Sequence, residues 1–164
     1  MSTPVIAGAV RTPIGALMGA LSSVPATELG AIAIREALAR AGVPADQVDD
    51  VLMGCILQAG LGQGPARQSA IAAGIPDSVP ATTINQLCGS GLRAVGMAAQ
   101  EIRAGDAEVV VAGGMESMSR APHVVHVREG QRLGDLALRD TLMADGLWCA
   151  LTDQHMGATA EVVA

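Results

Sequence analysis

Residues 81–114, ATTINQLCGSGLRAVGMAAQEIRAGDAEVVVAGG, contain the pattern that decides the fold class. A short β-branched run at 81–84 is followed by a helical segment that begins near Gly89 and ends at Ala104-Gly105. A largely apolar run at 108–112 then leads into two glycines. The apolar face of the helix consists of Leu92, Val95, Ala99 and Ile102. Strand, helix and strand in this order predict a unit with parallel strands.

The residues before this stretch continue the same alternation. Apolar runs at 4–9 and 50–57 indicate two buried strands. Between them we predict a helix with Thr27 as its N-cap, which stops at Gly42-Val43-Pro44. A further helix is expected from Pro65 to about Gly74. Continuous apolar strands that alternate with helices are typical of a mainly parallel sheet with helices on both faces.

The pattern changes after Gly114, where glycine, arginine and aspartate are scattered with only weak helical signals. We therefore predict an α/β core over residues 1–114 and the start of an irregular loop subdomain over residues 115–164. Residues 157–164 have helical character but no stop signal. We interpret the chain as part of a larger protein.

Composition excludes several classes of function for this 164-residue chain. All ten basic residues are arginine, so lysine-dependent Schiff-base chemistry and the Walker-A phosphate loop are excluded within it. Trp148 is the only aromatic residue and the net charge is −6, which argues against nucleic-acid binding. The start of the chain lacks the basic region of a secretory signal, and no apolar run could span a membrane.

The three cysteines are too widely spaced to predict a zinc site or a disulfide framework. This pattern fits a reducing, cytoplasmic compartment. We predict that Cys55, inside the apolar run 50–57, is a core residue, and that Cys149 has a packing role.

Cys88 is the strongest candidate for a catalytic residue. It lies between a predicted strand and a predicted helix start, where unpaired amides and the helix dipole favour the nucleophilic thiolate. Gly89 and Gly91 permit a sharp turn and a close approach of substrate to the backbone amides, which could stabilise an oxyanion. The same position also fits a small buried hydrophobic residue, and the local pattern leaves both interpretations open.

Five segments together resemble the N-terminal half of the thiolase family, in particular the acetyl-CoA acetyltransferases. They cover essentially the whole chain and read RTPIG at 11–15, QAGLGQGPARQ at 58–68, INQLCGSGL at 84–92, VVAGGMESMSRAP at 110–122 and HMGATAE at 155–161.

The resemblance implies that Cys88 carries an acyl group as a thioester. In the synthetic direction two acetyl-CoA molecules condense, and in the degradative direction CoA cleaves a 3-ketoacyl-CoA. The resemblance also implies that Leu147, His155 and Met156 line the substrate pocket, that no metal or other cofactor takes part, and that the chains assemble as a dimer or tetramer.

The chain departs from the family pattern in one respect. The family's Gly-His-Pro and Cys-x-Gly-Gly-Gly segments, which supply the base and part of the anion hole, are not found in it. We therefore expect that the catalytic cycle needs a C-terminal half, which a second chain could carry. Two alternatives stay open: a non-catalytic assembly or binding module, and a cysteine-dependent redox protein.

Overall fold

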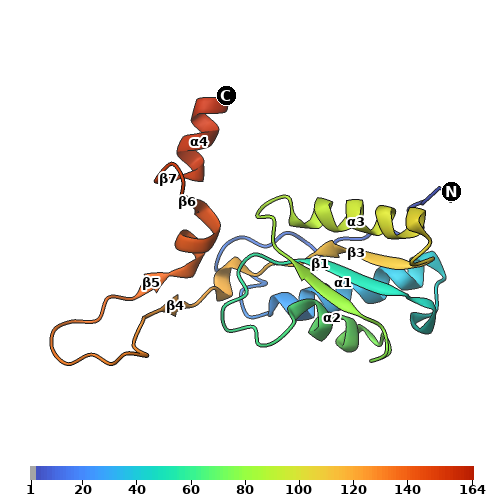
Figure 1. Ribbon diagram of the computed structural model, residues 1–164, viewed down its shortest axis with the longest axis horizontal. Helices are drawn as coiled ribbons and strands as arrows, with labels where there is room; N and C mark the ends of the chain where they lie inside the picture. The colour runs from blue at the N-terminus through green and yellow to red at the C-terminus, as the bar shows by residue number, and fades with distance from the viewer. Residues whose placement is uncertain (1–2) are drawn as a thin grey trace.

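The centre of the computed structural model, which describes residues 3–164, is a sheet of three parallel strands in the order β2-β1-β3. The strands are β1 (Asp50–Gly54), β2 (Ala81–Ile84) and β3 (Val110–Gly114). The helices are α1 (Ala26–Ala41), α2 (Pro65–Ala73) and α3 (Ser90–Ala104). Figure 1 shows α1 and α2 on one face of the sheet and α3 on the other, which confirms the predicted α/β class.

Side-chain alternation along β1 divides the core between the two faces of the sheet. Val51 and Met53 belong to the cluster that includes Ile34 of α1. Leu52 points to the opposite face and packs against Ala94 of α3. Because successive residues of a strand project to opposite faces, the apolar run of β1 fills both halves of the core.

The ends of the helices follow local glycine and proline chemistry. Pro65 is in the first turn of α2, and the helix ends at Gly74 with φ 95°. Gly42 ends α1 with φ 65°, a left-handed conformation that suits glycine. The predicted N-cap at Thr27 is wrong: α1 begins at Ala26 after Pro25, and no side chain caps it. Proline at this position already sets the backbone for the turn into a helix.

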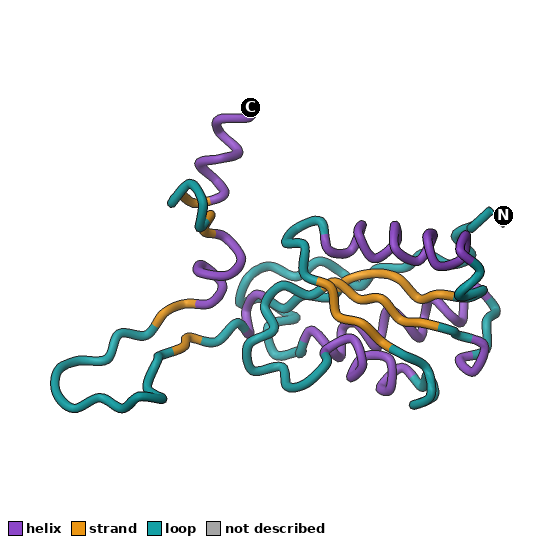
Figure 2. The backbone as a smooth tube through the Cα atoms, in the orientation of Figure 1, coloured by secondary structure: helices purple, strands orange, loops and turns teal. Residues whose placement is uncertain are grey.

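The N-terminal segment does not form the strand predicted for residues 4–9. It is drawn without secondary structure in Figure 2, and Val5 and Ile6 are 81% and 78% exposed. In the described part of the chain, the sheet pairs β3 only with β1. An apolar run forms a strand only when a neighbouring strand satisfies its backbone groups, and the run alone does not supply one.

Helix α3 packs by a different face from the one that its apolar residues define. Ala94 and Ala98 are buried against the sheet, whereas Leu92 is 79% exposed. The small side chains of these alanines let the helix lie close to the sheet. Gly54 of β1 and Gly114 of β3 lie beneath its first turn and leave room for this approach. Of the apolar face expected from the sequence, Leu92 and Val95 are therefore exposed, whereas Ala99 and Ile102 are half-buried.

Residues after 120 form an arm that extends from the layered core (Figure 1). Its elements are β4 (His123–Val124), β5 (Arg139–Asp140), the π-helix η3 (Leu142–Leu147), β6 (Trp148–Cys149), β7 (Gln154–His155) and α4 (Met156–Val163). Two 3₁₀ turns, η1 (Ala45–Gln47) and η2 (Met118–Arg120), belong to the connections nearer the sheet. Thr141 is buried at the base of the arm, where its hydroxyl donates to the Pro122 carbonyl at 2.6 Å.

The predicted boundary between the α/β core and the loop subdomain at residue 114 stays a prediction.

Within residues 3–164, no helix has the length and apolar character needed to cross a membrane.

Candidate active site

The candidate site lies at the carboxyl edge of the sheet. All three strands are parallel, so the residues that follow them come to the same edge. Cys55 follows β1, the turn that contains Cys88 follows β2, and Glu116 follows β3. Open α/β sheets commonly bind ligands at this edge.

Cys88 lies in a tight turn between β2 and α3, and it is exposed. The Gly89 amide donates to the Gln86 carbonyl at 3.2 Å, which closes the turn. Leu87, directly before the cysteine, has φ 51°, in the left-handed region that residues with a side chain rarely adopt. The interpretation of Cys88 as a buried hydrophobic residue does not fit this exposed position.

The first turn of α3 lies directly on the strands. A Cβ atom on Gly54 would stand 2.6 Å from the Ser90 Cβ and 2.8 Å from the Gly91 nitrogen. Only glycine at position 54 leaves room for this approach, since real Cβ contacts are never so short. The helix N-terminus is thereby fixed beside the turn that contains Cys88.

The backbone amides of the turn are not all free for a substrate. The Gly89 amide is already used to close the turn, and the Ser90 amide donates to the Leu87 carbonyl at 3.0 Å. The predicted contribution of these amides to an oxyanion site is therefore restricted to positions that the turn leaves open.

The structure confirms the prediction that Cys55 is a core residue. It is 1% exposed, and its Sγ lies 3.7 Å from Oε1 of Glu116. Burial, together with the neighbouring Glu116 carboxylate, raises the pKa of the Cys55 thiol to about 12. Cys55 therefore stays a protonated thiol at neutral pH.

Glu116 organises the loop after β1, a role that the sequence analysis missed. Its Oε2 accepts from the Ile56 amide at 2.8 Å, and its Oε1 accepts from the Leu57 amide at 3.3 Å. A carboxylate four residues after the predicted strand at 108–112 is the signal that could have pointed to it. Leu57 in turn lies against the arm, because a Cβ on Gly146 would be 3.4 Å from a Leu57 methyl carbon.

The three predicted substrate-binding residues gather in the arm. Leu147 ends η3, His155 ends β7 and Met156 begins α4. Trp148 pairs with His155 across the β6–β7 hairpin, which brings the three residues to one end of that hairpin. The Gly157 amide donates to Nδ1 of His155 at 2.9 Å, so His155 caps α4. Nε2 of the neutral ring then carries the proton.

Cys149 is partly exposed in the same hairpin. Hydrogen bonds from the side chain and backbone of Thr152, and from the Leu151 backbone, lower the pKa of its thiol. All three cysteines are free in the described residues, and Cys55 is enclosed in the core. Cys55 is therefore excluded as the accessible partner thiol that the redox alternative needs.

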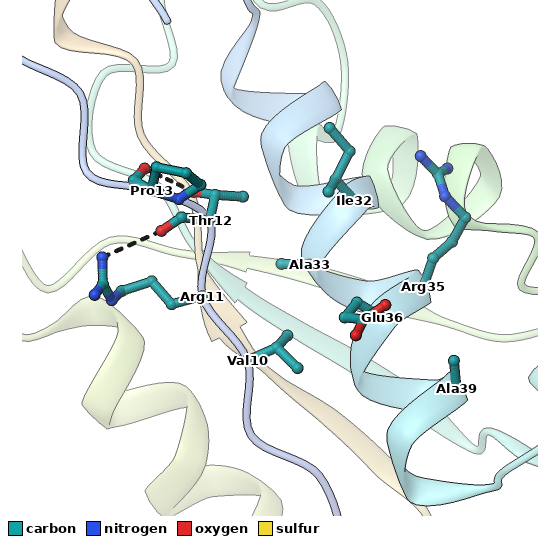
Figure 3. Close-up of a pocket in the computed structure, with 9 residues that line it drawn as sticks. All are labelled: Val10, Arg11, Thr12, Pro13, Ile32, Ala33, Arg35, Glu36 and Ala39. Atoms are coloured by element: carbon teal, nitrogen blue, oxygen red, sulfur yellow. Dashed lines mark hydrogen bonds between the residues drawn. The ribbon is translucent and has the colours of Figure 1, made fainter.

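One groove on the described surface is lined by residues of the N-terminal segment and of α1. Figure 3 shows it between the N-terminal segment and α1, where Arg11 turns to donate to the Thr12 carbonyl at 3.1 Å. None of the four predicted site residues lines this groove. Residues 3–164 also contain no cluster of three or more histidine, cysteine or acidic side chains that could hold a metal ion.

Comparisons with known proteins show similarity over essentially the whole chain. The thiolase N-terminal domain family matches residues 4–164. The chain is 57% identical over 165 residues to acetyl-CoA acetyltransferase from Cupriavidus necator, covering 100% of this chain and 42% of the relative. It is 52% identical over 160 residues to the cytosolic acetyl-CoA acetyltransferase of Mus musculus, covering 98% and 40%.

A solved structure is similar over the same region. The crystal structure of Acat5 thiolase from Ascaris suum in complex with coenzyme A superposes with a TM-score of 0.91 and 42% identity, covering 96% of this chain and 41% of that one. The chain thus spans about two fifths of the length of the relatives that it matches.

Proposed function

Because this chain belongs to the thiolase family, we propose that it is the N-terminal part of an acetyl-CoA acetyltransferase in which Cys88 is the acyl carrier. The relatives named above carry that activity in their names, and one solved relative binds coenzyme A. The single observation that carries the proposal is the exposed thiol in a tight turn at the start of α3.

The proposed chemistry has two balanced steps. The Cys88 thiolate attacks the carbonyl of acetyl-CoA, the C–S bond to CoA breaks, and CoA leaves as a thiolate that takes up a proton. A second acetyl-CoA, deprotonated at its methyl carbon, then attacks the acetyl-cysteine, and acetoacetyl-CoA and the free cysteine thiolate form. The reverse sequence is thiolysis of a 3-ketoacyl-CoA, and no metal or redox cofactor takes part in this proposal.

We assign substrate contacts to Leu147, His155 and Met156. Their support is their common position at one end of the β6–β7 hairpin, in an arm whose base lies against the loop after β1. His155 uses Nδ1 to cap α4, which leaves the Nε2 proton free to donate to a carbonyl of the substrate.

The base that removes the methyl proton is not assigned to a residue of this chain. We propose that it comes from the part of the relatives that lies outside the matched two fifths, on the same chain or on a second one. We also propose assembly as a dimer or tetramer and a cytoplasmic location, the latter supported by the name of the mouse relative.

Incubation with acetyl-CoA followed by intact mass measurement tests the proposal. We expect one acetyl group per chain, lost in Cys88→Ser and retained in the matched variant Cys149→Ser. Absence of the adduct, or its retention in Cys88→Ser, would overturn the proposal.

A non-catalytic assembly module is the competing candidate, favoured by the length of the relatives. To separate the two, the chain is mixed with the remaining C-terminal part of the Cupriavidus necator relative, and CoA-dependent cleavage of acetoacetyl-CoA is followed. Cleavage that depends on Cys88 supports the enzyme.

A further inference from the structure

We propose that Ser90 is a positioning residue for Cys88, acting through the turn that carries the thiol. Its hydroxyl holds the two residues before the cysteine, and it does so from the first residue of α3. The inference rests on the proposed function, because it concerns how the acyl carrier is presented.

The hydroxyl of Ser90 makes two hydrogen bonds within the turn. Oγ accepts from the Gln86 amide at 2.8 Å and donates to the Leu87 carbonyl at 2.6 Å. The side chain is 4% exposed, so water does not compete effectively for either bond. Cys88 is thus enclosed in a loop whose two ends are tied together by one hydroxyl.

The hydroxyl stabilises a backbone conformation that is otherwise unfavourable. Leu87 has φ 51°, which brings the Cβ of a side-chain residue close to its own backbone. Oδ1 of Asn85 accepts from the Leu87 amide at 3.0 Å and supports the turn from its other side. If the Ser90 bonds were lost, Leu87 could relax, and the direction of the next side chain, Cys88, would change.

Packing keeps the hydroxyl in place. Position 54 is glycine, and a Cβ there would stand 2.6 Å from the Ser90 Cβ, so Ser90 fits tightly between β1 and its own turn. The rigid sheet therefore determines where the hydroxyl lies, and the hydroxyl determines where the turn lies. Acyl transfer depends strongly on the direction of a nucleophile, since misplacement by about 1 Å can lower a rate about 100-fold.

The test follows acetylation by p-nitrophenyl acetate, a small ester that does not depend on a CoA site. Peptide mass spectrometry gives the ratio of the initial acetylation rates of Cys88 and Cys149, which serves as an internal reference. We expect Ser90→Ala to lower this ratio at least about fivefold. The matched variant Ser69→Ala, which removes a buried, hydrogen-bonded hydroxyl from α2, should leave the ratio unchanged.

A second substitution separates positioning from general destabilisation. Glycine adopts the left-handed region readily, so Leu87→Gly added to Ser90→Ala should restore at least half of the lost ratio. A merely structural role for Ser90 would not be rescued by a flexible residue. An unchanged ratio in Ser90→Ala, or no recovery in the double variant, overturns the proposal.

If Ser90→Ala does not fold, which acetylation of the buried Cys55 would reveal, two variants of the exposed Leu87 decide the question. Valine adopts the left-handed region poorly, so the ratio in Leu87→Val should be at least about fivefold below that in Leu87→Gly. Equal ratios contradict the proposal. Failure of the wild-type chain to accept acetyl from acetyl-CoA would instead count against the proposed function, so the two failures are distinguishable.

Discussion

The two faces of the central sheet differ in how they are filled. Towards α1 and α2, large side chains such as Ile34 and Met53 form a continuous buried cluster. Towards α3, Leu52 packs against alanines, while Leu92 on the outer side of the helix is 79% exposed. One face is thus filled by large side chains and the other is held by close approach of backbones, and the second arrangement fixes the turn that contains Cys88.

The largest expected effect concerns the sheet face that is filled by large side chains. Ile34→Ala removes a 2% exposed side chain, so the free energy of unfolding should fall by about 2–5 kcal/mol. Urea unfolding followed by circular dichroism measures the change. Leu92→Ala on the exposed side of α3 is the control, and it should change stability by less than about 0.5 kcal/mol. Equal losses in the two variants would contradict the comparison.

A smaller effect tests the face that is held by close approach. Gly54→Ala places a methyl group against Ser90 and Gly91, so either the strand or the helix must shift. We expect a loss of about 1–3 kcal/mol in the free energy of unfolding. The Cys88-to-Cys149 acetylation ratio should fall in the same variant. Wild-type stability together with a wild-type ratio would show that the helix start is not held by this contact.

The pH dependence of the free energy of unfolding tests the burial of Cys55, which belongs to the cluster towards α1 and α2. Its pKa is raised in the folded state, so the unfolded chain loses this proton first as the pH rises. The contribution of the protonated Cys55 thiol to the free energy of unfolding is therefore fully present below about pH 9. It is lost as the pH approaches 12, at up to about 1.4 kcal/mol per pH unit.

Comparison of wild type with Cys55→Ala isolates this contribution. The chain contains no lysine or tyrosine, so thiols are the main side chains that titrate in this range. Melting temperatures between pH 8.5 and about 10.5 should fall more steeply for wild type than for the variant. Parallel curves would mean that the Cys55 thiol ionises as readily in the folded chain as in the unfolded chain.

The smallest expected effect is a gain. Gly96 lies inside α3 with open space where a Cβ would stand, so Gly96→Ala should stabilise the chain by about 0.5–1 kcal/mol. Thermal unfolding measures the shift. A loss of stability would show that this side of the helix is not open.

Local signals were sufficient to predict most of the sheet and its helices. The runs at 81–84 and 50–57 contain β2 and β1, and proline and glycine mark α2 at both ends. These elements are determined by residues close together in the sequence. The strand predicted at 4–9 failed because a strand also needs a neighbour, which a local pattern cannot supply.

The candidate site was predictable only in part. Cys88 stood out because its position between a strand and a helix start is itself a local pattern. Ser90 and Glu116 were missed as contributors to the site, because their roles depend on backbone groups of neighbouring loops that become partners only after folding. Similarly, the outward direction of Leu92 follows from Gly54 and Gly114 on other strands.

Protection of Cys88 by substrate is the most direct test of the central claim, that this thiol takes an acyl group. The chain is incubated with acetyl-CoA, the remaining thiols are labelled with iodoacetamide, and peptides containing Cys88 and Cys149 are quantified. We predict that acetyl-CoA prevents labelling of Cys88, that added CoA restores it, and that Cys149 is labelled equally throughout. Full labelling of Cys88 after acetyl-CoA treatment would contradict the account.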